Sequence, residues 1–225
     1  NCSADVVSST VPCSTKWMTG TVNSFFIGIV ATIIATFLGT LAALGLSRPH
    51  MPYKGIIMAI LISPMIVPLI IAAAGMFFFY ARINLVYTFT GVILAHVALA
   101  TPFVVITVTA TLVGFDMNMV KASQSLGAKP MKTFFKIIMP LILPGIISGA
   151  LFAFITSFDE VVIVMFMASL DQLTIPKQMW AGIRQEISPV ILCMATCLVI
   201  LSIFLLTTVE LLRRRSEKLR GITAR

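Results

Sequence analysis

Residues 91–128 read GVILAHVALATPFVVITVTATLVGFDMNMVKASQSLGA, an apolar run without Asp, Glu, Lys or Arg up to Phe115 that is followed at once by a short polar segment. A membrane-spanning helix needs about 20 predominantly apolar residues, which this run supplies. The segment after it begins with Asp116 as an expected N-cap, continues with an apolar face at helical spacing, and ends at Gly127. The stretch therefore predicts a membrane helix that leads into a short surface helix.

The rest of the chain has the same apolar character. Of its 225 residues, 59% are hydrophobic and 11% are charged, and the mean hydropathy is +1.05, which leaves too little polar surface for a soluble globule. Besides 83–115, apolar segments cover 22–46, 55–80, about 141–170, and 187–209. Their lengths suit helices better than barrel strands. We predict an all-α polytopic membrane protein with five visible transmembrane helices in one domain, residues 1–225.

The distribution of Lys and Arg predicts the orientation, since cationic loops stay on the cytoplasmic side. Only four of the 16 Lys and Arg residues fall on the opposite side: Lys16, Arg82, Lys177 and Arg184. Residues 1–20 are then external and residues 213–225 form a basic cytoplasmic tail. The net charge of +8 is a topology signal and does not indicate nucleic-acid binding. An external amino terminus that begins with Asn1 points to an additional N-terminal helix before the five.

The segment 116–140 carries the signals of a helix, a hinge and a second helix. After Gly127, Pro130 suits the first turn of a new helix, and Pro140 and Pro144 are expected to mark the entry into the next span. The charge distribution places this segment on the cytoplasmic face, where an amphipathic helix can lie on the membrane or dock into a groove.

This segment resembles the EAA loop of ABC importer permeases. Lys121-Ala122-Ser123, Gly127, Ile137 and Met139-Pro140 keep the family spacing of Glu-Ala-Ala, Gly, Ile and Leu-Pro. Together with FITSFDEVVIVMF, residues 154–166, the text from about Asn23 onward resembles the spermidine/putrescine branch. Three residues depart from the pattern, and Lys121 in place of Glu reverses a charge, so an ion pair made by that Glu does not carry over.

The resemblance implies a type I importer in the bacterial inner membrane, with six spans as the usual number. The implied partners are a second permease subunit, two ATPase subunits that bind ATP and Mg, an external solute-binding protein, membrane lipid and a small-molecule substrate. It also implies that the loop couples to the ATPase through Lys121, Ala122, Ser123, Gly127, Ala128, Ile137 and Pro140.

The chain lacks the sequence signs of an enzyme. It contains neither G-x-x-x-x-G-K-[ST] nor G-x-G-x-x-G, so we expect no ATP hydrolysis, no cofactor, and no catalytic or metal site in this chain. Cys2 and Cys13 lie in the external segment, where a disulfide is chemically allowed. Cys193 and Cys197 lie four apart on the last helix, where we expect core or lipid-facing packing.

Asp159 and Glu160 are the strongest candidates for a substrate pathway. A carboxylate deep in a bilayer costs roughly 2.5 to 3.5 kcal/mol, so it normally faces a protein interior or an aqueous cavity. On one helix the two would point about 100° apart, so that one meets substrate while the other fixes a neighbouring helix or subunit. A purely structural role is the open alternative. For His96, a packed and hydrogen-bonded side chain is the first expectation and a pathway role the alternative.

Two functions remain. The favoured one is the permease subunit of an ATP-driven, binding-protein-dependent importer for a polyamine or a related amine-bearing solute. The alternative is a self-sufficient secondary carrier or channel that uses Asp159 and Glu160. The EAA-like loop favours the importer, because a carrier has no need for a hinged ATPase-docking segment.

Overall fold

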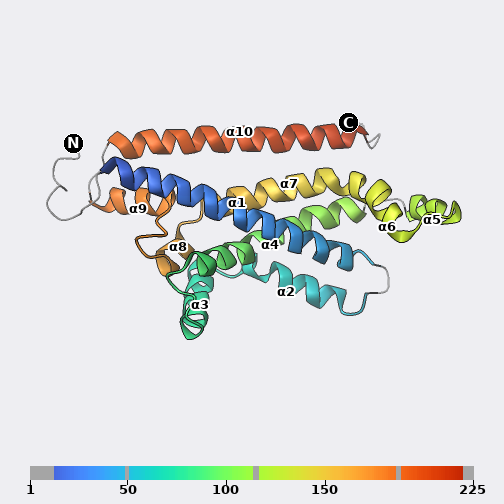
Figure 1. The fold of residues 1–225 in the computed structure, drawn as a ribbon, viewed down its shortest axis with the longest axis horizontal. Coiled ribbons are helices and arrows are strands. Elements are labelled where there is room, and N and C mark those ends of the chain that lie inside the picture. Colours follow the sequence, from blue (N-terminus) through green and yellow to red (C-terminus); the bar gives the residue numbers. More distant parts are fainter. Residues whose placement is uncertain (1–12, 49–50, 114–116, 186–188, 220–225) are drawn as a thin grey trace.

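The structure is a computed structural model that describes residues 13–48, 51–113, 117–185 and 189–219. The described residues contain helices and no strand. Four helical segments among these residues are long and apolar enough to cross a membrane. Three of them lie in single helices, α1 (Cys13–Leu46), α4 (Phe89–Val113) and α10 (Pro189–Leu219). The fourth is the continuous segment Pro130–Phe158, which ends in α7 (Met139–Phe158). All four run along the long axis of the molecule (Figure 1). The expected all-α membrane architecture is confirmed.

Small residues bring α1, α4 and α7 together into the core of the molecule. A Cβ atom on Gly39 of α1 would meet Val104 of α4, and one on Gly149 of α7 would meet Thr107 of α4. Without a side chain at these positions the backbones approach closely, which is how helices associate in a membrane where burial of apolar surface gives no advantage over lipid. By contrast, α10 covers this core from one side only, and Leu192, Ile203 and Phe204 are exposed on it.

The apolar segment 55–80 does not form one continuous helix. It forms α2 (Lys54–Ile66) and α3 (Leu69–Arg82), which are bent by 104°. Val67 between them is extended, with φ −69° and ψ 134°, because it precedes Pro68 and a residue before proline avoids the helical region. If the bent pair is one span, the chain has the five spans that the apolar segments predict.

The segment 141–170 is also broken, so the assumption that Asp159 and Glu160 share one helix is wrong. Helix α7 ends at Phe158, and the short helix α8 (Val162–Met167) begins only after Val161. An irregular stretch, 168–174, then leads to α9 (Ile175–Gln185). Such a break is tolerated at membrane depth only where protein groups satisfy the freed backbone atoms.

The segment between α4 and α7 forms the predicted helix, hinge and second helix. Helix α5 (Met117–Ser125) ends before Gly127, whose φ of 76° favours glycine, and α6 (Pro130–Thr133) begins at Pro130. The expected boundary at Pro140 and Pro144 is wrong, because α6, the π-helix η1 (Phe134–Ile138) and α7 form the single segment Pro130–Phe158. Pro140 lies in the first turn of α7, where its missing N–H costs little.

Figure 1 places α5 and α6 at the same end of the molecule as the last turns of α10, while the first turns of α1 and α9 lie at the opposite end. This matches the two sides into which the charges divide the chain. Helix α1 begins at Cys13, so residues 13–20 of the expected external segment are already helical. Cys2, Asp116 and the tail beyond Leu219 lie outside the described residues.

Candidate functional site

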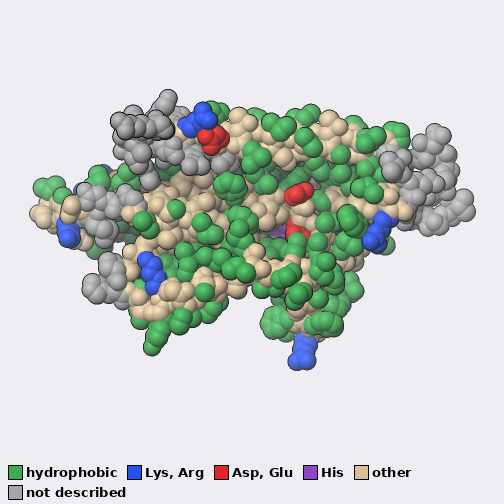
Figure 2. Space-filling view, turned by 180° about the vertical axis from the view of Figure 1, so that it is seen from behind, with side chains coloured by type: hydrophobic (Ala, Val, Ile, Leu, Met, Phe, Trp, Pro, Cys, Tyr) green, Lys and Arg blue, Asp and Glu red, His purple; other side chains and the backbone are tan. Residues whose placement is uncertain are grey.

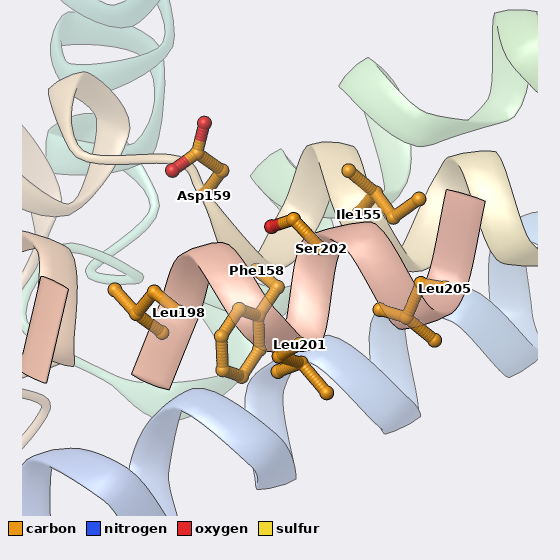
Figure 3. Close-up of a pocket in the computed structure, with 7 residues that line it drawn as sticks. All are labelled: Ile155, Phe158, Asp159, Leu198, Leu201, Ser202 and Leu205. Atoms are coloured by element: carbon orange, nitrogen blue, oxygen red, sulfur yellow. The ribbon is translucent and has the colours of Figure 1, made fainter. Parts of the chain in front are cut away.

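Asp159 lies in the break between α7 and α8, at the rim of a small pocket between α7 and α10. The pocket is about 40 Å³ and is lined by Ile155, Phe158, Asp159, Leu198, Leu201, Ser202 and Leu205. The carboxylate points away from Phe158 and Leu201 (Figure 3). It is exposed and has no hydrogen-bond partner within the described part of the chain. The pocket has room for a few water molecules at most, so a larger ligand would meet Asp159 outside it.

Glu160, its neighbour, is turned inward and is only 8% exposed. Its Oε1 accepts a hydrogen bond of 2.9 Å from the backbone N–H of Ile163. Glu160 therefore acts as an acceptor for the first turn of α8, whose N–H groups have no partners within the helix. The two adjacent carboxylates differ fully in their surroundings.

His96 is a buried link between α4 and α7. It is 1% exposed, and its Nδ1 lies 2.8 Å from Oγ of Ser157, which is itself buried. Its Nε2 is buried without a hydrogen-bond partner in the described ranges. The structure thus agrees with a packed, hydrogen-bonded histidine. Its partner Ser157 lies one residue before Phe158, where α7 ends ahead of Asp159 and Glu160.

Figure 2 shows acidic side chains near mid-length of one face and another beside a cationic side chain closer to one end, in a surface that is otherwise largely hydrophobic. A second depression, a groove of about 340 Å³ between α1 and α7, is lined mainly by Ile, Leu and Phe side chains, among them Ile33, Ile147 and Phe154. A polar cationic solute finds no charged partner in that groove, so the face that carries Asp159 is the better candidate for a substrate path.

Lys177 on α9 holds the far end of α8, and sequence reasoning missed it. Its Nζ donates hydrogen bonds to the carbonyl oxygens of Val164 (3.2 Å) and Ala168 (2.8 Å). Burial lowers the pKa of this half-buried amine, because the charged form loses hydration. The sequence contains one signal for a role of Lys177: it is one of only four Lys and Arg residues on the side of the chain predicted to be external.

The stretch between α8 and α9 is attached to the first turns of α1. The side-chain amide nitrogen of Asn23, Nδ2, donates to the carbonyl oxygens of Asp171 (2.8 Å) and Leu173 (3.0 Å). The hydroxyl oxygen of Ser24 accepts a hydrogen bond of 2.9 Å from the backbone N–H of Ile175. Sequence analysis did not single out either residue, since a polar pair at the start of an apolar helix has many roles.

At the other end, α5, the turn 126–129 and α6 form a unit that we call the coupling hairpin, residues 117–133. Ser123 is 7% exposed, and its Oγ lies 2.8 Å from Oγ1 of the buried Thr133, which joins the two helices. Thr133 is the residue of this pair that the motif did not reveal. The N–H of Ala128 donates to the carbonyl of Ser123 across the glycine turn.

The other predicted coupling residues divide between surface and interior. Lys121, Ala122 and Gly127 are exposed, whereas Ala128 and Ile137 are half-buried and Pro140 is exposed in the first turn of α7. Large apolar side chains accompany them at the surface: Met119, Leu126 and Met131 are 48%, 87% and 70% exposed. Large exposed apolar side chains such as these are typical of a docking surface for a protein partner.

Within the described ranges, no group of three or more His, Cys, Asp or Glu side chains could hold a metal ion. Cys193 and Cys197 are free and exposed on α10.

Comparisons with known proteins agree with this arrangement. The family profile described as "Binding-protein-dependent transport system inner membrane component" matches residues 35–218. The chain is 30% identical, over 87% of its length and 76% of the relative, to the spermidine/putrescine transport system permease protein PotC of Haemophilus influenzae. It is 38% identical to the putrescine transport system permease protein PotI of Escherichia coli K12, over 46% of this chain and 37% of that protein.

Solved structures share the fold. A chain of the MetNI methionine ABC transporter, in an inward-facing conformation, aligns with a TM-score of 0.65 at 18% identity, covering 96% of this chain and 100% of that one. A chain of an amino acid ABC transporter aligns with a TM-score of 0.66 at 17% identity, covering 90% and 94%. The fold is that of ABC transporter permeases.

Proposed function

This chain belongs to the family of binding-protein-dependent transport system inner membrane components, and from that premise we propose that it imports a polyamine or a related amine-bearing solute. As a member of the family it is a transmembrane permease subunit and not an enzyme, and ATP hydrolysis belongs to a partner subunit. The alternative of a self-sufficient carrier or channel is not favoured, because the matched relatives are permease proteins of transport systems.

The observation that carries the substrate proposal is the free carboxylate of Asp159. An ammonium group binds a carboxylate that has no other partner more readily than one that is already saturated, because no existing hydrogen bond must be broken. Asp159 is exposed without a partner in the described residues, whereas the carboxylate of Glu160 already accepts a hydrogen bond from the N–H of Ile163. We propose Asp159 as the substrate-facing group of the pair. His96, buried between α4 and α7, would support the helix end beside it.

The orientation and partners follow the division of charge. We assign the end with the coupling hairpin to the cytoplasm, together with the C-terminus, and the end with α9 to the external side. The apolar patch of Met119, Leu126 and Met131 would dock on one of two ATPase subunits that bind ATP and Mg. A second permease subunit would complete the path at the Asp159 face, and an external solute-binding protein would deliver the substrate.

The test is uptake of radiolabelled spermidine by proteoliposomes that contain the assembled importer, together with identification of the co-purified subunits. Asp159→Asn should lower uptake about tenfold or more, as expected for loss of a charge-assisted interaction. Asp171→Asn, an exposed acid in the stretch before α9, is the matched control and should transport normally.

Normal uptake by the Asp159→Asn importer would remove Asp159 from the pathway. Purification of a transport-competent chain without an ATPase would instead contradict the importer itself, whatever the effect of the substitution.

A further inference from the structure

Helix α8 is too short to be stable by its own hydrogen bonds. It covers Val162–Met167, and a helix leaves its first four N–H groups and last four carbonyl groups without internal partners. Adjoining residues pair with two of these groups, since the N–H of Met165 donates to the carbonyl of Val161 and the carbonyl of Val164 accepts from the N–H of Ala168, so the other end groups of α8 need partners from elsewhere. Ile163, Val164 and Met167 are fully buried, so water does not reach these side chains. The groups that stabilise the two ends must therefore come from elsewhere in the chain.

Each end of α8 is met by a side chain of the charge that suits it. The carboxylate of Glu160 accepts from the N–H of Ile163 in the first turn, and the ammonium group of Lys177 donates to the carbonyl oxygens of Val164 and of Ala168, the residue that follows the helix. The helix dipole favours an anion at the first position and a cation at the last. Neither side chain forms an ion pair with another side chain in the described part of the protein.

The position of α8 determines the position of Asp159. Only Glu160 and Val161 separate Asp159 from the first residue of α8, so the carboxylate cannot keep its place if α8 shifts or unwinds. The body of α8 packs on α3 and α4, and the carbonyl of Met167 accepts a hydrogen bond of 2.9 Å from the N–H of Tyr87. Of these contacts, the pair of bonds from Lys177 is the one that comes from the external helix α9.

From this geometry we propose that Lys177 is a positioning residue of the transport pathway, whose ammonium group fixes the end of α8 and thereby the place of Asp159. The inference rests on the proposed function, in which Asp159 faces the substrate. Lys177 lies one turn before Trp180, which is 45% exposed, and the guanidinium of Arg184 lies 5.6 Å from the Trp180 ring. A displacement of the exposed face of α9 would therefore reach Asp159 through Lys177.

The first test measures whether α8 opens, and it needs no substrate. The test uses the complete importer in which the four cysteines of this chain are replaced by Ala. Val164→Cys then reports on α8 and Val104→Cys on the core of α4, since both native side chains are fully buried. Lys177→Met should raise the rate at which a maleimide labels position 164 by about tenfold or more, as expected for loss of charged hydrogen bonds. Labelling at position 104 should not change.

Arg184→Met is the matched control, because it removes a cation from the same helix without touching α8, and it should leave labelling at position 164 unchanged. An unchanged rate at 164 in the Lys177→Met importer would overturn the proposal. A parallel rise at 104 would overturn it as well, because Lys177 would then support the whole fold and not α8.

The second test measures the position of the pathway residue itself. A spin label on Asp159→Cys should show a more mobile spectrum in the Lys177→Met importer than in the parent, while a label on Ser202→Cys, across the pocket on α10, should keep its spectrum. Equal spectra at position 159 would refute the link to Asp159. Neither test uses transport, so a chain that imports a different solute can still pass both, and failed spermidine uptake leaves their results intact.

Discussion

The coupling hairpin and the break between α7 and α8 both interrupt a helical path, yet they are stabilised by different kinds of interaction. The hairpin turns at Gly127 and restarts at Pro130, and a hydrogen bond between its helices joins Ser123 to Thr133, ten residues apart. The break at Asp159 depends on Lys177, which reaches α8 from the next helix, and on His96, which contacts Ser157 across 61 residues. At the surface, water satisfies what the turn leaves open, whereas within a membrane other protein groups or water held in a cavity must do so.

Among the substitutions that test this difference between the two regions, Glu160→Ala is expected to have the largest effect. The substitution leaves the buried N–H of Ile163 in the first turn of α8 without its acceptor, which costs about 2 kcal/mol. For a chain of this size the unfolding temperature should fall by about 4–8 °C. Unfolding in detergent is measured by the fluorescence of the tryptophans. Glu160→Gln keeps an acceptor oxygen, so its unfolding temperature should fall by less than half as much as that of Glu160→Ala.

Asp159→Asn is the neighbouring control, since that carboxylate is exposed and without a partner in the described residues, and its unfolding temperature should stay within about 1 °C of the parent. Equal losses for Glu160→Ala and Asp159→Asn would mean that the two carboxylates do not divide their roles as the contacts indicate.

A smaller effect is expected in the hairpin from Gly127→Val. At φ 76° a side chain costs about 1–2 kcal/mol, and a β-branched one is the least tolerated. The turn should distort, and the share of ATPase subunits that co-purify with the permease should fall. Gly127→Asn should retain most of the partner, because Asn tolerates this conformation.

Gly55→Val is the control for Gly127→Val, because it shows whether the added side chain acts through backbone strain or through crowding. Neither glycine has an atom within 4 Å of an added Cβ, but only Gly127 has a positive φ. If both Val variants lose the ATPase to the same degree, the backbone conformation of Gly127 is not the cause.

The same contrast explains how much could be predicted from the sequence. The apolar segments, the helix before Gly127 and the start at Pro130 follow from local signals, and the structure confirms them. Hydropathy measures the transfer of side chains into lipid and does not distinguish a continuous helix from a broken one, so the ends of α2 and α7 were missed. Lys177 could not be found because its hydrogen bonds are formed only when α9 folds back onto α8.

The prolines of this chain do not mark the ends of helices consistently. Pro68 ends a helix because Val67 before it becomes extended, whereas Pro140 and Pro144 sit within one continuous segment. The π-helix Phe134–Ile138 directly before α7 alters the pattern of backbone hydrogen bonds there, so Pro140 falls in a first turn where no N–H is required. Residue type alone does not separate the two outcomes.

The smallest expected effect is that of Ser123→Ala, which restores the Ala of the EAA pattern. Loss of the buried hydrogen bond to Thr133 should destabilise the hairpin by about 1 kcal/mol, seen as faster hydrogen exchange of the α5 amides. Ser125→Ala is the control, because its exposed hydroxyl bonds only to the carbonyl of Lys121 in its own helix, and it should exchange as the parent does. Equal exchange in the two variants would show that the bond between Ser123 and Thr133 has no net effect. A difference would show that this hairpin, although its ends are set by local signals, also depends on a polar pair that the family pattern does not contain.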